Sequence, residues 1–173
     1  MTHIKNLIVD VDGVLSASEL LYDSTGKKMK VFGPDDHDAL NMLRDKLNIV
    51  FISGDKRGFE ISKRRVVTEM KFELYLVSTL DRIKWIKERF NPKETIFMGD
   101  GIFDHVVFKE VAYSICPSDG FYLTKEKADF VTSAPGGKRA VAEACVHILK
   151  KFFNQSDIIP NRKYGIWKDK HGK

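Results

Sequence analysis

The sequence predicts a doubly wound α/β domain with a mainly parallel sheet, a small β-hairpin insertion and no large cap. Strand-like apolar segments alternate with amphipathic, helix-like segments along the 173-residue chain. The strand segments are continuous apolar runs, which are typical of a parallel sheet covered on both faces. Three of them end in small or acidic residues, "DVDG", "SGD" and "GDG". Ligands of such sheets bind beyond the carboxyl ends of the strands, so these three ends mark the expected site.

Local patterns predict each element in order. The expected strands cover residues 6–12, 48–54, 72–77, 94–100, 113–117 and 128–132. The expected helices cover residues 35–47, 59–70, 78–90, 101–111 and 136–153. The third of these helices has Ser78 or Thr79 as its expected N-cap. Residues 19–32, "ELLYDSTGKKMKVF", predict a hairpin that turns between Asp23 and Lys27. We therefore expect one domain over residues 1–153, followed by a basic tail over residues 154–173.

Composition and charge restrict the class of protein and the kinds of partner that the chain can have. Hydrophobic residues make up 43% of the chain and charged residues 31%, which is ordinary for a globular protein. No apolar run approaches the roughly 20 residues that cross a bilayer, and residues 1–6 lack a signal-peptide pattern, so we expect a cytoplasmic protein without a membrane partner. The net charge of +5 suits anionic small substrates as well as nucleic acid, but no nucleic-acid motif is present. Cys116 and Cys145 have no metal-ligand spacing and are expected to be reduced and structural.

The first strand ends in two carboxylates, Asp10 and Asp12, followed by Gly13. Strand alternation points both side chains to the same side, where they repel each other unless a cation is present. Asp100 follows another strand and is expected at the same edge of the sheet. Oxygen ligands of this kind suit Mg²⁺, which binds through a few carboxylates and substrate phosphate. The sequence therefore predicts a magnesium site, although Asp100 alone is also a common helix N-cap.

These residue types fit phosphoryl transfer. Asp10 can attack phosphorus to form an aspartyl-phosphate, and Asp12 can protonate the leaving group and then activate water. Ser53 and Gly54 supply a hydroxyl and backbone N–H groups for phosphoryl oxygens. A cation is also needed to balance charge on the transferred group. Arg82, near the start of its helix, is the first candidate for that cation, and Lys84 competes with it.

"DVDGVL", "FISGD", a basic residue that opens a later helix and "MGDGIFD" occur here in the order seen in the haloacid dehalogenase superfamily of phosphohydrolases. The chain resembles a small, capless branch of that superfamily. This branch contains the 3-deoxy-D-manno-octulosonate 8-phosphate phosphatases and phosphatases of nine-carbon, sialic-type sugar 9-phosphates. The likeness covers roughly residues 4–150 and includes the hairpin and the closing "GGKRAVAEACVHILK" helix.

The resemblance implies a Rossmann-like fold and a role for each matching residue. It makes Asp10 the nucleophile and a metal ligand, and Asp12 the acid/base, with its backbone carbonyl on the metal. It makes Ser53 a phosphate ligand, Asp100 the third protein ligand of the metal, and Asp104 a brace for the loop, although Asp104 can equally be structural. The sequence departs from the branch where Arg82 replaces a usual Lys, where Asp55 replaces a frequent Arg, and where Asp35 replaces a basic residue.

Together these observations predict a magnesium-dependent phosphatase of a small phosphorylated metabolite, most simply an acidic sugar phosphate such as an ulosonate 8- or 9-phosphate. The alternative is a weakly active or inactive domain that serves assembly of a sugar-nucleotide pathway enzyme. Without a large cap, the site needs cover from elsewhere, and an isolated hairpin is marginally stable in water. We therefore expect a homotetramer with sites at subunit interfaces, in which hairpins pack through apolar side chains. The side chains expected at these contacts are Leu20, Leu21, Tyr22, Val31 and Phe32.

Overall fold

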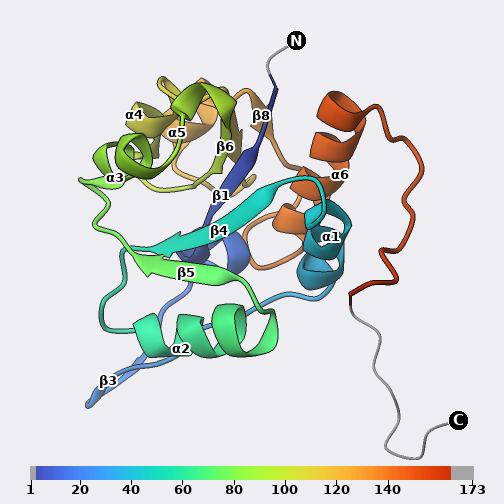
Figure 1. Ribbon diagram of the computed structural model, residues 1–173. Helices are drawn as coiled ribbons and strands as arrows, with labels where there is room; N and C mark the ends of the chain where they lie inside the picture. The colour runs from blue at the N-terminus through green and yellow to red at the C-terminus, as the bar shows by residue number, and fades with distance from the viewer. Residues whose placement is uncertain (1–2, 165–173) are drawn as a thin grey trace, which may run out of the picture.

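The computed structural model describes residues 3–164 and is built around one six-stranded sheet (Figure 1). The strands are β1 (Asn6–Asp10), β4 (Asn48–Ser53), β5 (Glu73–Leu76), β6 (Thr95–Met98), β7 (Tyr113–Cys116) and β8 (Phe130–Val131). Their order across the sheet is β5-β4-β1-β6-β7-β8, and every neighbouring pair is parallel. The predicted parallel α/β fold is confirmed.

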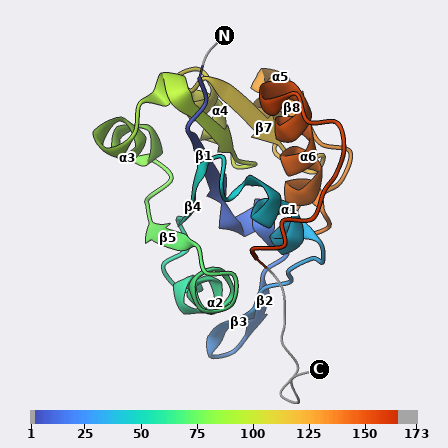
Figure 2. The same cartoon turned by 45° about the vertical axis from the view of Figure 1, so that its right-hand side comes forward.

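Helices cover both faces of this sheet, as Figures 1 and 2 show. They are α1 (Asp36–Leu43), α2 (Phe59–Lys63) with the wider turn η2 (Arg64–Glu69), α3 (Arg82–Arg89), α4 (Asp104–Phe108), α5 (Tyr122–Lys127) and α6 (Ala140–Phe153). A wider helical turn, η1 (Val11–Leu15), follows β1, and a tighter one, η3 (Pro92–Glu94), precedes β6. Strands β1, β4, β6 and β7 are almost entirely buried, as their unbroken apolar sequences predict. The edge strands β5 and β8 are partly exposed.

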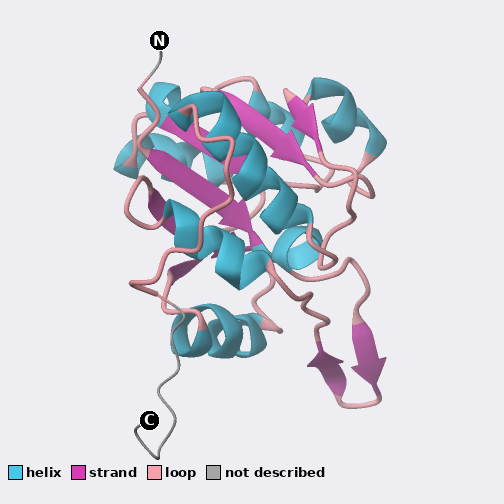
Figure 3. Cartoon of the chain, turned by 90° about the vertical axis from the view of Figure 1, so that its right-hand side faces the viewer, coloured by secondary structure: helices cyan, strands magenta, loops and turns pink. Residues whose placement is uncertain are grey.

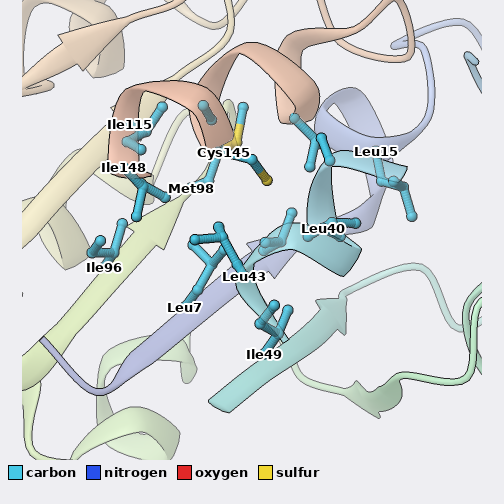
Figure 4. Close-up of a cluster of buried hydrophobic side chains, with 14 of the residues drawn as sticks. Leu7, Leu15, Leu40, Leu43, Ile49, Ile96, Met98, Ile115, Cys145 and Ile148 are labelled. Atoms are coloured by element: carbon cyan, nitrogen blue, oxygen red, sulfur yellow. The ribbon is translucent and has the colours of Figure 1, made fainter. Parts of the chain in front are cut away.

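The core is divided by the sheet into two clusters of buried side chains. One lies under α1 and α6 and joins side chains such as Leu40, Leu43 and Ile148 to Leu7 and Ile96 (Figure 4). The other lies under α3 and α4 and is formed by Ile8, Val50, Ile52, Val77, Ile86, Phe97, Val107, Phe108, Val111 and Cys116. Cys116 and Cys145 are both buried and free, as predicted. No helix among residues 3–164 is long and apolar enough to cross a membrane.

The register of the three central strands brings the predicted site residues to one edge. Asp10, at the end of β1, pairs with Ile52 of β4, one residue before Ser53. On the other side, Val9 pairs with Met98, the last residue of β6. The loop that carries Asp100 therefore leaves the sheet beside Asp10, and Ser53 ends its strand on the opposite flank.

The hairpin is present but shorter than its sequence suggested. It consists of β2 (Leu21–Asp23) and β3 (Gly26–Met29), which pair antiparallel and project from the body of the domain (Figure 3). An isolated antiparallel bridge between Ser16 and Phe32 closes its base. Phe32 packs against the core of its own subunit. Phe32 is thus partly buried within its own subunit, whereas the other apolar side chains of the hairpin are exposed.

Two local predictions differ from the structure. The helix that follows β5 begins at Arg82, and its N-cap is Asp81. The Ser78 hydroxyl accepts a hydrogen bond from the Leu80 N–H inside the preceding turn, so Ser78 and Thr79 do not cap the helix. The short helix α5 was not predicted, because its sequence, "YLTKEK", has little helical periodicity. A tertiary contact fixes it: the buried Thr124 hydroxyl donates to the Gly101 carbonyl at 2.7 Å.

The described part of the C-terminal segment turns back toward α1 after α6 ends. Three of its side chains meet Asp45. The Lys163 ammonium lies 2.9 Å from that carboxylate, the Asn161 amide donates to it at 3.0 Å, and the Tyr164 hydroxyl donates to it at 3.0 Å. These contacts lower the pKa of the exposed Asp45 carboxyl to about 2. Residues 165–173, including Trp167, lie outside the described residues.

A buried acid, Asp36, joins α1 to α6. Its carboxylate accepts the Ala142 N–H at 2.8 Å, so it satisfies a donor in the first turn of α6, while the side chain is 1% exposed. Burial raises the pKa of Asp36 to about 6, and the Ala142 N–H, Arg65 and Arg139 offset only part of that effect. Because the folded-state pKa is raised, the fold favours the protonated acid. The associated stability is present below about pH 4 and is lost as the pH rises through about 6.

Asp36→Asn is therefore expected to stabilise the protein at neutral pH, because the amide keeps an acceptor for Ala142 and carries no charge. The gain in unfolding free energy over the wild type should grow by about 3 kcal/mol between about pH 4 and about pH 8. Urea unfolding across that range measures it, with Asp38→Asn, an exposed neighbour on α1, as the control. A gain that does not change with pH would contradict this account of Asp36.

Candidate active site

The site begins where β1 ends. Asp10 is 2% exposed, and its Oδ1 accepts the Val11 N–H at 2.8 Å. The chain then turns sharply through η1, where Gly13 has a φ of +82°. A Cβ at Gly13 would lie 2.1 Å from Asp100 Oδ2, so both the backbone conformation and the space require glycine. Behind this loop, Gly136 approaches so closely that an added Cβ would lie 2.0 Å from the Gly13 carbonyl oxygen. The two glycine-rich segments therefore hold the loop in place.

Arg82 lies at the centre of the site. Its guanidinium contacts Asp10 Oδ2 at 2.6 Å through one nitrogen and Asp104 Oδ1 at 2.5 Å through another. Arg82 is only 3% exposed. A charge buried this deeply needs partners, and Arg82 has a carboxylate on each side. Lys84, the competing candidate from the sequence, is exposed and lines a different depression beside Trp85. The geometry therefore favours Arg82 over Lys84 as the cation beside Asp10.

Asp100 and Asp104 complete an acidic cluster with Asp10. Each of the three offers a carboxylate oxygen within 4.8 Å of the others. Burial, followed by the surrounding charges, raises the pKa of both Asp10 and Asp100 above the usual range of a carboxyl. Asp104 has both oxygens engaged, since Oδ2 accepts the Gly101 N–H at 2.9 Å and Oδ1 meets Arg82. Its position thus suits a brace, while Asp10 and Asp100 are the carboxylates that a divalent cation would stabilise most.

Asp12 and Ser53 lie together on the β4 side of Asp10. The Ser53 hydroxyl donates to Asp12 Oδ2 at 2.7 Å and accepts the Asp55 N–H at 3.1 Å. Ser53 is fully buried, whereas Gly54 is exposed at the start of the following loop. A cleft of about 370 Å³ lies over these groups. It is lined by Asp10, Asp12, Leu20, Lys27, Gly54, Asp55, Thr79, Arg82, Asp100, Gly101, Ile102, Phe103 and Asp104. The structure therefore brings every sequence-predicted site residue except Lys84 and Ser53 to the wall of one cleft, with Ser53 directly behind Asp12.

Comparisons with known proteins show what the chain is similar to. No protein-family model matches it. It is 30% identical over 156 residues to the 3-deoxy-D-manno-octulosonate 8-phosphate phosphatase KdsC of Haemophilus influenzae, which covers 87% of this chain and 85% of that protein. The chain belongs to the KdsC family.

Solved structures of KdsC-family proteins agree with this assignment. The cobalt-bound form of the Haemophilus influenzae deoxy-D-mannose-octulosonate 8-phosphate phosphatase has a TM-score of 0.75 at 28% identity and covers 90% of this chain and 92% of its own. The 3-deoxy-D-manno-octulosonate 8-phosphate phosphatase of Yersinia pestis has a TM-score of 0.74 at 25% identity and covers 88% and 84%. The resemblance to the haloacid dehalogenase superfamily and the enzyme class, a phosphoric monoester hydrolase, are confirmed. A divalent metal cofactor is consistent with the cobalt in the Haemophilus protein.

Sequence reasoning missed two cations of the site in this KdsC-family chain. Lys27 and Lys30 come from the hairpin, and both contact Asp55, at 2.5 Å and 2.9 Å. Lys30 also lies 2.6 Å from Asp12 Oδ1. In the sequence "GKKMK" these lysines have the pattern of a solvated strand. The only signal for them is that the carboxylates at the strand ends outnumber the cations predicted beside them. The two lysines and the hydrogen bond from the Gly58 N–H lower the pKa of Asp55 to about 2, against the effect of its burial.

The acidic segment Asp35–Asp38, in which the chain departs from the KdsC pattern, does not reach the cleft. Asp35 forms an ion pair with Arg139 at 2.5 Å on the surface. Asp36 caps α6, and Asp38 is exposed on α1. None of these carboxylates lines the cleft around Asp10. Of the three departures noted in the sequence, Arg82 and Asp55 therefore affect the site directly, and Asp35 does not.

Proposed function

We propose that this protein is a magnesium-dependent phosphatase that hydrolyses an acidic sugar phosphate, such as an ulosonate 8- or 9-phosphate, through an aspartyl-phosphate intermediate. The observation that carries the proposal is the position of Asp10. It is a buried carboxylate at the end of the central strand, held by Arg82 and adjacent to Asp100. A carboxylate fixed in this way at the floor of a cleft is suited to nucleophilic attack on phosphorus.

The residues fit a magnesium ion. Asp10 and Asp100 are largely buried, and this burial, together with the neighbouring carboxylates, raises the pKa of both in spite of Arg82. Asp10, Asp100 and the backbone carbonyl of Asp12 would hold the ion. When bound, it supplies charge stabilisation for the phosphoryl oxygens and relieves the repulsion between the carboxylates. Asp104 keeps its contacts with Arg82 and the Gly101 N–H and braces the loop.

The chain's own groups can carry out both halves of the reaction. One carboxylate oxygen of Asp10 attacks phosphorus, and the bond to the sugar oxygen breaks. Asp12 gives a proton to that oxygen and, in the second half, takes one from the water that releases phosphate. The Ser53 hydroxyl, the backbone N–H of Gly54 and Arg82 bind the phosphoryl oxygens during both steps. Arg82 offers a planar fork where a Lys would offer a point charge, so it orients as well as neutralises.

The substrate class rests on the relatives and on the polarity of the cleft. The KdsC relatives are named for an eight-carbon acidic sugar phosphate. The cleft wall beside Asp12 carries Lys27 and Asp55, polar groups that can meet sugar hydroxyls or a carboxylate, while Leu20, Ile102 and Phe103 form its apolar parts. The assembly-only alternative finds no support here, because the set of Asp10, Asp12 and Asp100 is complete.

The test is phosphate release from a panel of phosphorylated sugars with Mg²⁺ present. The panel contains octulosonate 8-phosphate, nine-carbon ulosonate 9-phosphates, and neutral hexose phosphates of similar size. The proposal predicts that an acidic sugar phosphate has the highest kcat/KM. Equal or higher kcat/KM for the neutral sugars would contradict the substrate class, and no turnover of any monoester would contradict the function.

The hairpin supports a prediction about assembly. Its exposed apolar side chains are Leu20, Leu21, Tyr22, Met29 and Val31, each between 39% and 58% exposed. Apolar side chains in such a cluster commonly mark a protein interface. Light scattering at micromolar concentration is therefore expected to show a homotetramer whose sites lie at subunit interfaces. In a double variant with Leu21→Ser and Val31→Ser, the oligomeric state should shift toward the monomer, and the activity should be lost. A fully active wild-type monomer would contradict the shared-site assembly.

A further inference from the structure

Lys30 is a buried lysine with three partners. Its side chain is 0% exposed, although lysine is among the residues least often buried. The ammonium lies 2.6 Å from Asp12 Oδ1 and 2.9 Å from Asp55 Oδ2, and it donates to the Ser62 hydroxyl at 2.8 Å. The contacts with the two carboxylates are ion pairs, and the contact with the hydroxyl is a hydrogen bond. The Lys30 ammonium is therefore fixed between three oxygens, one of which is Asp12 Oδ1.

Both oxygens of Asp12 are engaged, but by contacts of different kinds. Oδ1 meets Lys30, and Oδ2 accepts the Ser53 hydroxyl at 2.7 Å. In the proposed reaction the Ser53 hydroxyl turns to a phosphoryl oxygen when substrate binds. Oδ2 is then released toward the leaving group, and Lys30 is the contact that still fixes the carboxylate. This consequence depends on the proposed function, in which Asp12 is the acid/base and Ser53 binds phosphate.

We propose that Lys30 is a positioning residue that holds Asp12 in line with the leaving-group oxygen through Oδ1, so that Oδ2 is free to transfer the proton. Lys30 does not touch the substrate in this arrangement. The hairpin thereby serves the site of its own subunit through Lys30, in addition to any role in assembly.

The surroundings of Lys30 restrain it on the side away from Asp12. Asp55 accepts from it while also contacting Lys27 and accepting the Gly58 N–H at 3.0 Å. The packing is tight at Gly58, where an added Cβ would lie 2.7 Å from Lys30 Cε and 2.2 Å from Asp55 Oδ2. Pre-organisation of this kind is what a proton-transfer group requires, because small displacements of catalytic groups cost large factors in rate.

The test compares two leaving groups. A sugar alkoxide needs a proton as it departs, whereas p-nitrophenolate does not, and kcat/KM covers the steps up to that departure. For Lys30→Met we expect kcat/KM to fall by roughly 10²-fold for the sugar phosphate that the wild type turns over fastest. For p-nitrophenyl phosphate we expect a decrease of no more than about threefold. Lys28→Met, on the exposed side of the same hairpin, is the control and should change neither value.

A general loosening of the hairpin would lower both kcat/KM values by the same factor, and that result would overturn the proposal. A double-mutant cycle provides a second test of whether Lys30 acts through Asp12. If Lys30 acts through Asp12, adding Lys30→Met to Asp12→Asn changes the rate by less than about twofold, whereas independent roles give multiplied losses. Multiplied losses would also overturn the proposal.

If Lys30→Met does not fold, Ser62→Ala removes one of the three partners of the same ammonium at a residue outside the cleft, and it should give a smaller loss that is again selective for the sugar phosphate. If the wild type releases phosphate but neither variant shows that selectivity, only the role of Lys30 is wrong. If the wild type hydrolyses no phosphate monoester, the proposed function itself is wrong, and the role of Lys30 falls with it.

Discussion

Asp10→Asn is expected to abolish phosphate release while the protein stays folded. The amide has the shape of the carboxylate and keeps an acceptor for the Val11 N–H, but it lacks the charge that attacks phosphorus. The loss should be at least roughly 10⁴-fold in kcat, because a nucleophile cannot be replaced by neighbouring groups. Initial rates of phosphate release by purified variants measure it, and circular dichroism shows whether the fold survives.

The variant also has an expected effect on stability. Burial raises the pKa of Asp10, so the fold bears a cost for its charge, and a neutral amide removes that cost. Thermal unfolding in the absence of metal should therefore occur at the same temperature as in the wild type or higher. Asp12→Asn provides a graded comparison, with an expected loss of roughly 10²–10⁴-fold. Turnover near the wild-type level in Asp10→Asn would rule out the covalent mechanism.

Removal of divalent metal is expected to abolish turnover as completely as Asp10→Asn does. Asp10, Asp100 and Asp104 lie within 4.8 Å of one another, and Arg82 is the cation that contacts two of them. Activity should disappear on exhaustive chelation and return with Mg²⁺. Ca²⁺ should restore it poorly, because it prefers more ligands and looser geometry.

A binding measurement separates metal affinity from catalysis. Added Mg²⁺ should raise the unfolding temperature of the wild type, since a ligand that binds only the folded state stabilises it. Asp100→Asn should lose most of this shift, whereas Asp38→Asn, an exposed carboxylate on α1, should keep it. Full activity after chelation, or an equal shift in Asp100→Asn, would mean that Asp100 is not a metal ligand.

The fold and the acidic cluster could be predicted from sequence because both depend on patterns along the chain. Continuous apolar runs define buried parallel strands, and the residue that follows such a run lies at the carboxyl edge of the sheet. Asp10, Ser53 and Asp100 each take this position. Their convergence follows from the strand order, which places β1 between β4 and β6.

The cations of the site could not be predicted in the same way. The choice between Arg82 and Lys84 depends on where α3 begins, and a helix start varies by a few residues when no side chain caps it. Lys30 follows the lysine-rich second strand of the hairpin, "GKKM", so nothing in its pattern marks it as buried. Its position is set by contacts with Asp12 and Asp55, which are far from it along the chain. Likewise, the close approach of Gly136 to Gly13 is a tertiary contact without a local signal.

The most direct test of the central claim is mass spectrometry of protein quenched in acid during turnover of an acidic sugar phosphate. Peptides that contain Asp10 should carry the mass of one phosphoryl group. With p-nitrophenyl phosphate, whose leaving group needs no proton, Asp12→Asn should increase the modified fraction because it slows hydrolysis of the intermediate. Asp10→Asn should show no modification. Rapid turnover by the wild type, with Asp10 unmodified at every quench time in the wild type and in Asp12→Asn, would contradict phosphoryl transfer to Asp10.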